Sequence, residues 1–261
     1  MNDADRLVNL EAEDRAFIEK WRDQLLPMSV DLVSYLRAHR NSYVLFEGAQ
    51  GALLDIDTGS YPFVSSGMSC SAGAAAQGGI GPRRIDRVLG VFKAYSTRVG
   101  NGPFPTEFHD DSAGSLSSYI RETGNEYGVT TGRPRRCGYL DLVALRYAVA
   151  ANSIDRLVLT HLDVYDELEE FDACVAYRVR GRIVEDFPAS VRDREDAEPV
   201  LRRFKGWKAD ISAAREYAEL PQRAKDYIAF IEEFVETPVS MVSVGSDRGQ
   251  TIVRESPWTR S

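Results

Sequence analysis

Short apolar segments rich in β-branched residues alternate along this chain with segments of helical periodicity. The apolar segments are residues 42–48, 88–100, 156–166 and 238–248. Each of them runs into a loop rich in Gly, Ser, Thr or Asp, and helical patterns such as 139–151 separate them. Strands that alternate with helices usually pair in parallel, so we expect an α/β fold with a mostly parallel central sheet and flanking helices. Ligands of such sheets gather at the carboxyl ends of the strands.

The remaining segments predict the domain organisation. Residues 1–41 are expected to form a helical N-terminal segment, since apolar side chains recur at helical spacing over 10–26. The alternating run 173–187 turns at Arg180-Gly181 and predicts a β-hairpin. The charged, weakly patterned residues 188–220 predict a surface excursion, which places hairpin and excursion together near 172–220. The rest of 42–261 is expected to belong to the α/β part.

Composition excludes several classes of protein. With 261 residues and 43% hydrophobic side chains, the chain can bury a core, and its net charge of -8 argues against a nucleic-acid partner. No apolar run approaches the roughly 18 residues of a membrane span, and the acidic start does not look like a signal peptide. Three widely separated cysteines, Cys70, Cys137 and Cys174, suit the cytoplasm. We therefore expect a cytoplasmic protein without a membrane partner.

A concentrated cationic loop, TTGRPRR at 130–136, stands out against the acidic chain. Guanidinium groups bind carboxylates and phosphates through paired hydrogen bonds, and the helical pattern that follows adds the partial positive charge of a helix N-terminus. The loop could bind a small dianion, or it could be a solvated turn paired with surface acids. Composition alone leaves both alternatives open.

Three other segments are candidate ligand loops. Residues 57–82 are dense in small side chains, which favours close packing against a ligand or another backbone over a linker. Asp163, after the strand 156–160, could accept two hydrogen bonds from the amidine edge of guanine, or it could simply cap a helix. SVGSDR at 243–248 could form a backbone nest or an ordinary turn. No histidine has partners at metal-ligand spacing, so we expect no metal site in the chain.

Taken in order, several motifs resemble the adenylosuccinate synthetase family from about Tyr43 to about Arg254. They include FEGAQG, IGPRRID, KAYSTRVGNGPFPTE and GNEYGVTTGRPRRCGYLDLVALR. The resemblance implies a fold related to the P-loop nucleotide-binding proteins and a GTP-dependent ligase, typically homodimeric, that joins IMP and L-aspartate with the help of Mg²⁺. GTP is then a co-substrate, and the reaction leads towards AMP.

The resemblance also implies binding roles, position by position. IMP would contact Gln50, Ser65, Val99 with the adjacent Gly100, and Arg133. L-Aspartate would bind the loop of Val129, Thr130, Thr131, Gly132, Arg133 and Arg135. GTP would contact Arg135, His161, Leu162, Asp163, Ser243, Val244 and Gly245.

The largest departure from the family is the lack of its initial Gly-Asp-Glu-Gly-Lys-Gly-Lys loop, which supplies the catalytic aspartate and a magnesium ligand. We therefore expect the fold to be incomplete at its N-terminus, with no catalytic residue or metal ligand in this chain, which alone would be inactive. His161 also replaces a lysine, residues 65–73 diverge from the usual phosphate loop, and Gly245-Ser246 lacks a proline.

Three hypotheses fit this pattern. The chain is a partial or divergent adenylosuccinate synthetase, working as a homodimer or with a separate N-terminal half. Otherwise it is a non-catalytic relative that binds purine nucleotides, or a related ligase that uses a different amine.

Overall fold

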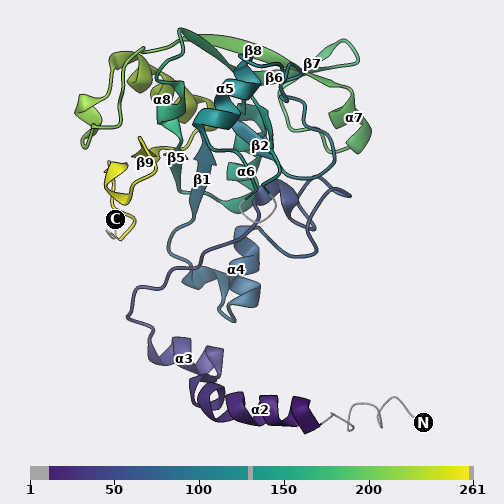
Figure 1. Cartoon of the computed structure of the whole chain (residues 1–261), viewed down its shortest axis with the longest axis vertical. Coiled ribbons are helices and arrows are strands. Elements are labelled where there is room, and N and C mark those ends of the chain that lie inside the picture. Colours follow the sequence, from purple (N-terminus) through teal and green to yellow (C-terminus); the bar gives the residue numbers. More distant parts are fainter. Residues whose placement is uncertain (1–11, 129–131, 259–261) are drawn as a thin grey trace.

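The fold is built on one mostly parallel sheet. The structure, a computed structural model, describes residues 12–128 and 132–258 (Figure 1). In spatial order the strands of this sheet are β1 (Leu89–Lys93), β5 (Arg156–Thr160), β9 (Val239–Ser243) and β10 (Thr251–Val253). The first three run parallel, and β10 is antiparallel to β9. The predicted α/β class with its parallel central sheet is confirmed.

A second sheet is built around the long strand β6 (Glu170–Val179). Its other strands are β4 (Leu140–Asp141), parallel to β6, and β7 (Arg182–Val184) and β8 (Ala197–Lys205), both antiparallel to it. The predicted hairpin is confirmed: Arg180 and Gly181 join β6 to β7 with φ values of 50° and 79°. Two consecutive positive φ angles match the twist of the two strands, and glycine adopts them without strain.

The expectation of a weakly patterned excursion at 188–220 is wrong in part. Residues Ala197–Lys205 form β8, which pairs with β6 along nearly its whole length after the short helix α7 (Val191–Glu195). Most of β8 is exposed, and its charged side chains, such as Arg203 and Lys205, pair with acidic residues of β6. A strand with so little buried surface lacks the apolar alternation by which strands are recognised.

Three helices cover the strands: α5 (Leu116–Thr123), α6 (Leu142–Asn152) and α8 (Gln222–Val235). The buried Asp141 caps α6 by accepting a hydrogen bond from the backbone N–H of Ala144 at 2.9 Å. Helix α8 buries Tyr227, Ile228 and Ile231, whose spacing of one and three residues forms a single apolar face. No helix in the described ranges has the length and apolarity needed to cross a bilayer.

The predicted strand at 88–100 is two strands. Ala94 and Tyr95, both buried, separate β1 from β2 (Ser96–Arg98), which pairs with β3 (Arg136–Gly138) in a small antiparallel ribbon. Tyr95 therefore lies in the core at the point where β1 leaves the main sheet. That position matters for the candidate site.

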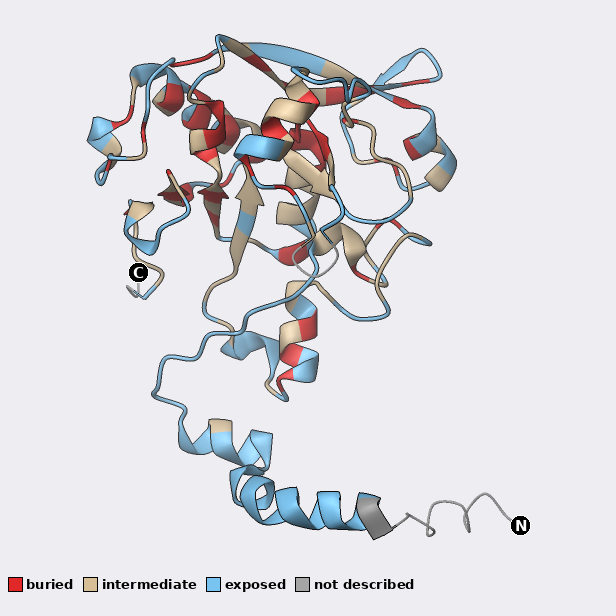
Figure 2. Ribbon diagram, in the orientation of Figure 1, coloured by how far each residue is buried: buried red, intermediate tan, exposed pale blue. Residues whose placement is uncertain are grey.

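An arm extends from the body of the molecule (Figure 1). It contains the predicted N-terminal helices α2 (Ala12–Leu25) and α3 (Leu32–Ala38), and α4 (Ser71–Gln77) lies between it and the body. Figure 2 shows α2 and α3 exposed, whereas buried residues gather around the sheets. The expected buried strand at 42–48 is wrong: Tyr43 is 72% and Leu45 70% exposed in an extended segment. In the described part of the chain no strand pairs with residues 42–48, so none donates backbone hydrogen bonds to this segment or buries its apolar side chains.

Gly206, directly after β8, provides a test of this packing. A Cβ atom there would lie 1.8 Å from the carbonyl oxygen of Leu168, in the turn before β6. Backbone cannot yield as a flexible side chain can, so Gly206→Ala should lower the free energy of unfolding by about 2–4 kcal/mol in urea denaturation. The control is Gly67→Ala, because a Cβ at the exposed Gly67 meets nothing within 4 Å. Equal stability of the two variants would contradict the packing described.

Candidate functional site

Three loops meet where the parallel strands end. Lys93 of β1 is in register with Thr160 of β5, and Leu159 of β5 with Val242 of β9. The N–H of Ala94 continues this pairing by donating to the carbonyl of Thr160 at 2.9 Å. The residues that follow each strand therefore lie at one edge of the sheet, where open α/β folds bind ligands.

The loop after β5 carries His161, Leu162 and Asp163. His161 adopts a left-handed conformation with φ of 59° and leads into the 3-10 helix η4 (Leu162–Tyr165), which contacts β9. Leu162 is fully buried, so its side chain anchors this loop in the core. Asp163 is partly exposed, and burial raises its pKa against the effect of a backbone hydrogen bond. An incompletely hydrated carboxylate of this kind is a good acceptor for paired N–H donors.

The loop after β9 is a tight turn. The hydroxyl of Ser243 donates to the carbonyl of Gly245 at 2.8 Å, and the N–H of Val244 donates to the carbonyl of Gln250 at 2.9 Å. A Cβ on Gly245 would come within 2.3 Å of the Gln250 side chain. The side chain of Val244 is in the core. These contacts fix the loop beside η4, so two of the three segments expected to bind GTP lie together.

A buried carboxylate, Glu126, connects the edge of the sheet to the arginine loop. It is 1% exposed and accepts from Lys93 Nζ at 2.5 Å and Tyr95 Oη at 2.6 Å through one oxygen. Its other oxygen accepts from Arg135 at 2.9 Å. Burial opposes its ionisation, but the hydrogen bonds from Lys93 and Tyr95 outweigh this and lower the pKa of Glu126. It is therefore an anion at neutral pH and holds Arg135 at this edge.

The chain is paired on either side of residues 129–131. Tyr127 and Pro134 form an antiparallel bridge, and the N–H of Gly128 donates to the carbonyl of Arg133 at 2.8 Å. Gly132 has a positive φ of 63°. Arg133 is exposed and Arg135 is half-buried. Three members of the predicted aspartate loop, Val129, Thr130 and Thr131, lie outside the described residues.

Arg136, the third arginine of the cationic run, supports the structure from within β3. It pairs with Glu107 and donates to the carbonyls of Gly100 and Gly102 at 3.1 and 3.0 Å. These bonds shape the turn after Val99, which is 68% exposed next to Gly100 with φ of 81°. Both residues are among those expected to contact IMP.

The small-residue segment 57–82 is held by another buried carboxylate. Asp55 accepts from the N–H groups of Asp57 and Thr58 and, across the loop, from those of Ser69 and Cys70. Burial acts against ionisation, but these backbone hydrogen bonds outweigh it and hold the pKa of Asp55 well below its usual range. The close packing against backbone that the small residues predict is present here.

Two residues expected to contact IMP, Gln50 and Ser65, lie before and after Asp55 in the sequence. The hydroxyl and the N–H of Ser65 each lie 2.8 Å from the carbonyl oxygen of Leu54 and donate to it. Gln50 is exposed and has an unusual positive φ of 64°, followed by Gly51 at 141°. Such a strained turn in a polar residue is common at functional positions.

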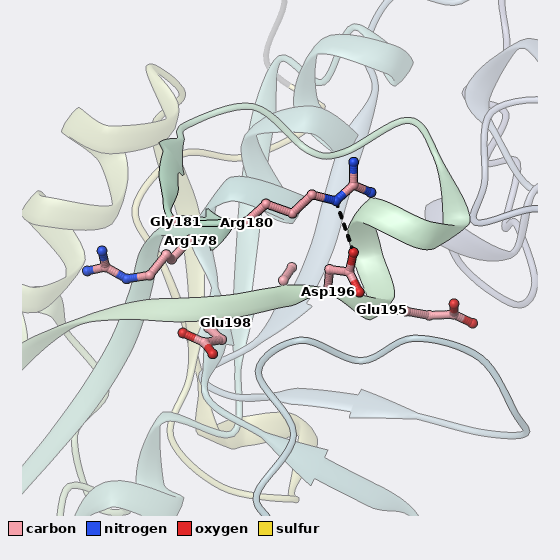
Figure 3. Close-up of a pocket in the computed structure, with 7 residues that line it drawn as sticks. Arg178, Arg180, Gly181, Glu195, Asp196 and Glu198 are labelled. Carbon is pink, nitrogen blue, oxygen red and sulfur yellow. Dashed lines mark hydrogen bonds and ion pairs between the residues drawn. The ribbon is translucent and has the colours of Figure 1, made fainter.

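Two hollows lie outside this edge. One, of about 500 Å³, lies between the β6–β7 turn and the start of β8 (Figure 3). Arg180 reaches Asp196 across it, and three acidic side chains face two arginines in its lining, a charge that does not favour an anion. The other, of about 580 Å³, is lined by the turn 101–105 and by Arg136 and Arg194. None of the residues expected to bind a ligand lines either hollow.

Comparison with known proteins decides the family. The family model for adenylosuccinate synthetase matches residues 2–252. The chain belongs to the adenylosuccinate synthetase family. The adenylosuccinate synthetase of Prochlorococcus marinus (strain NATL1A) is 49% identical over 220 residues, covering 84% of this chain and 49% of that protein. That of Moorella thermoacetica is 50% identical over 215 residues, 82% of this chain and 49% of its own.

Solved structures agree. The fully ligated adenylosuccinate synthetase of Plasmodium falciparum superposes with a TM-score of 0.87 at 40% identity, over 95% of this chain and 59% of that one. The succinoaminodeoxyadenylate synthetase of cyanophage S-2L shares the fold at a TM-score of 0.55 and 19% identity. The chain thus spans about half the length of the curated adenylosuccinate synthetases it matches. The family match also begins at residue 2, well before the expected boundary near Tyr43.

Sequence reasoning missed the residues at the centre of the site. Lys93, Tyr95 and Glu126 were not among the candidates, although Glu126 is the one carboxylate within the GNEYG run that precedes the arginine loop. A charge placed among glycines and next to a cationic loop was the available signal. In the described ranges no group of three or more His, Cys, Asp or Glu side chains could hold a metal ion. Among those residues no such group is available to the Mg²⁺ that the family implies, an ion that usually takes one or two carboxylates together with substrate phosphates.

Glu126→Gln tests the buried ion pair. The substitution removes the charge that Lys93 and Arg135 share, so we expect the free energy of unfolding at neutral pH to fall by about 2–4 kcal/mol, since both cations keep some contact with water. Because the folded-state pKa is lowered, the carboxylate stabilises the protein fully above its unfolded-state pKa of about 4.3 and progressively less as the pH falls through the folded-state value.

Urea denaturation from neutral pH to about pH 3 measures both effects. Acid should therefore destabilise the wild-type protein more steeply than Glu126→Gln below about pH 4. The matched control is Glu122→Gln, at an exposed residue of α5. Identical acid profiles for wild type and Glu126→Gln would show that Glu126 is not an ionised partner.

Proposed function

We propose that the protein carrying this chain joins IMP and L-aspartate in a GTP-dependent reaction that yields adenylosuccinate. Within it, this chain supplies the loops that recognise guanine and hold the dicarboxylate. The observation that carries the proposal is the meeting of the loops after β1, β5 and β9 with Arg135, which Glu126 fixes at the same edge. Family membership gives the chemistry that such an edge would perform.

Guanine is assigned to the edge between η4 and the loop after β9. Asp163 would accept hydrogen bonds from the N1–H and the exocyclic amine of guanine, a pair of donors that adenine lacks. The backbone of Ser243–Gly245 would close over the base. The buried side chains of Leu162 and Val244 support this assignment, because they anchor both loops in the hydrophobic core.

The dicarboxylate is assigned to the arginine loop. Arg133 and the adjacent Thr130 and Thr131 would bind the carboxylates of L-aspartate, and Arg133 would also approach the ribose of IMP. Gln50, Ser65 and Val99 would contact the rest of IMP. Arg135, expected to contact both L-aspartate and GTP, would lie between the two ligands, since its guanidinium is already directed to Glu126, which contacts Tyr95 just after β1. In this proposal these residues bind and orient substrates.

The proposal includes a polypeptide partner. The outer edge of β1, on the side away from β5, pairs with no strand in the described part of the chain, and Val91 within it is 70% exposed. Large apolar side chains are exposed along the arm as well, among them Phe17, Leu26 and Met28. Unpaired edges and apolar patches of this kind are sites of association. We assign this surface to the part of the family domain that this chain does not span, with a second copy as the alternative partner.

The reduced cysteines Cys70, Cys137 and Cys174 accord with the cytoplasmic location that the proposal assumes.

An assay with Arg133→Ala tests the reaction. The protein that carries this chain should form adenylosuccinate from GTP, IMP and L-aspartate. Chromatography measures the product. Arg133→Ala should weaken L-aspartate binding by about 2–5 kcal/mol, seen as a higher KM, because a carboxylate loses its charged partner. Arg182→Ala, in β7 of the second sheet, is the control. GTP binding without any product would favour a nucleotide-binding protein, and product formed only with another amine would favour a related ligase.

Asp163→Asn tests the choice of base. An asparagine offers one acceptor where the carboxylate offers two, so GTP affinity should fall by about 10–100-fold, the range for one good bidentate contact to a base, while ATP binding stays weak and unchanged. Calorimetric titration with each nucleotide measures this. The control is Asp210→Asn, because Asp210 is exposed and its charge also acts on Asp163. A GTP affinity equal to that of the control would remove Asp163 from base recognition.

A further inference from the structure

A chain of four side chains links the loop after β5 to the arginine loop. His161 Nδ1 lies 3.3 Å from Tyr95 Oη, and Tyr95 Oη lies 2.6 Å from one oxygen of Glu126. The other oxygen of Glu126 lies 2.9 Å from the guanidinium of Arg135. The path therefore begins two residues before Asp163 and ends two residues after Arg133. No other residue is needed to complete it.

The proton positions on this path follow from the chemistry of its members. An ionised carboxylate only accepts hydrogen bonds, so the single proton of Tyr95 points to Glu126. Tyr95 Oη then accepts from His161, which must carry its proton on Nδ1. Burial, assisted by the charge of Lys93, lowers the pKa of His161, and burial together with Glu126 raises that of Tyr95. These shifts favour a neutral histidine and a neutral tyrosine, and both forms are compatible with the arrangement.

Water cannot replace the middle of the path, because Tyr95 and Glu126 are each 1% exposed. Glu126 divides its charge between two sides: Lys93 and Tyr95 on one oxygen, and Arg135 on the other. An anion that draws the Arg135 guanidinium away leaves Glu126 with fewer donors. The carboxylate then becomes a stronger acceptor for Tyr95, and hydrogen bonds in such a series strengthen one another.

We propose that this chain of hydrogen bonds couples the two loops, so that a dicarboxylate at the arginine loop and a guanine nucleotide beside Asp163 raise each other's affinity. The inference rests on the proposed function, which supplies the two ligands. Tyr95 is a positioning residue in it, since it touches neither ligand and acts through Glu126 and His161. The coupling is reciprocal, as any linkage between two binding equilibria must be.

Calorimetry on the protein that carries this chain tests the coupling. L-Aspartate is titrated with and without GDP, and GDP with and without L-aspartate, with IMP present throughout. GDP keeps the guanine base and prevents turnover. In the wild-type protein each ligand should raise the affinity for the other by about five-fold or more. In Tyr95→Phe that factor should fall below about two-fold, the lower limit of a measurable coupling, whereas the affinity for each ligand alone changes little.

Two further variants separate coupling from packing. Tyr165→Phe removes a hydroxyl from an equally buried tyrosine that donates to the carbonyl of Ala94 at 2.9 Å, outside the path, and it should keep the wild-type coupling factor. His161→Phe interrupts the path at its partly exposed end, so it should lose coupling as Tyr95→Phe does even if the latter folds poorly. If Tyr95 had only a structural role, Tyr95→Phe would change the affinity for each ligand alone and leave the coupling factor intact.

The outcomes distinguish this inference from the proposed function. If the wild-type protein binds both ligands and Tyr95→Phe or His161→Phe retains the full coupling factor, the inference is overturned and the proposed function stands. If the wild-type protein binds neither GDP nor L-aspartate, the proposed function fails and the inference fails with it.

Discussion

Parallel pairing of β1, β5 and β9 is the constraint on which the rest of the structure depends. Their hydrogen bonds fix the register, and the buried Leu157, Leu159 and Val242 fill the space between the sheet and its helices. Parallel strands all end at the same edge, so three loops far apart in the sequence must meet there. The polar groups at the ends of those strands and in the loops that follow can then act on one ligand.

Two buried carboxylates determine the shape of the loops around that edge. Asp55 gathers backbone N–H groups from both ends of a glycine-rich segment, and Glu126 gathers a lysine, a tyrosine and an arginine. Each is costly to bury alone and stable only with its full set of donors. Segments rich in glycine, serine and alanine have little side-chain packing of their own, so these ionic contacts replace the apolar contacts that order a helix or strand. Glu126 thereby holds Arg135 at the ends of the parallel strands, and Asp55 fixes the small-residue segment.

Local patterns in the sequence predict the strands β1, β5 and β9, the helix α6 and the hairpin at Arg180-Gly181, because each depends on near neighbours. The prediction fails where stability comes from elsewhere. Residues 42–48 have the composition of a strand but no pairing strand among the described residues, and β8 has a pairing strand but little apolar pattern. The positions of the loops at the strand ends can also be predicted from the sequence. Which residues of the site are important cannot, because Glu126 acquires its role from a contact with Lys93, 33 positions earlier.

Ser65 shows how a geometric detail constrains recognition. Its hydroxyl proton and its amide proton both point to the carbonyl of Leu54, so the oxygen of the side chain has only lone pairs to offer. A phosphate dianion also has only lone pairs. For Ser65 to hold such a group, the hydroxyl must rotate about χ1 or about its C–O bond and leave Leu54 with the amide alone. If Ser65 binds a phosphate, that binding requires this rotation, and its cost depends on how firmly the carbonyl of Leu54 retains the proton.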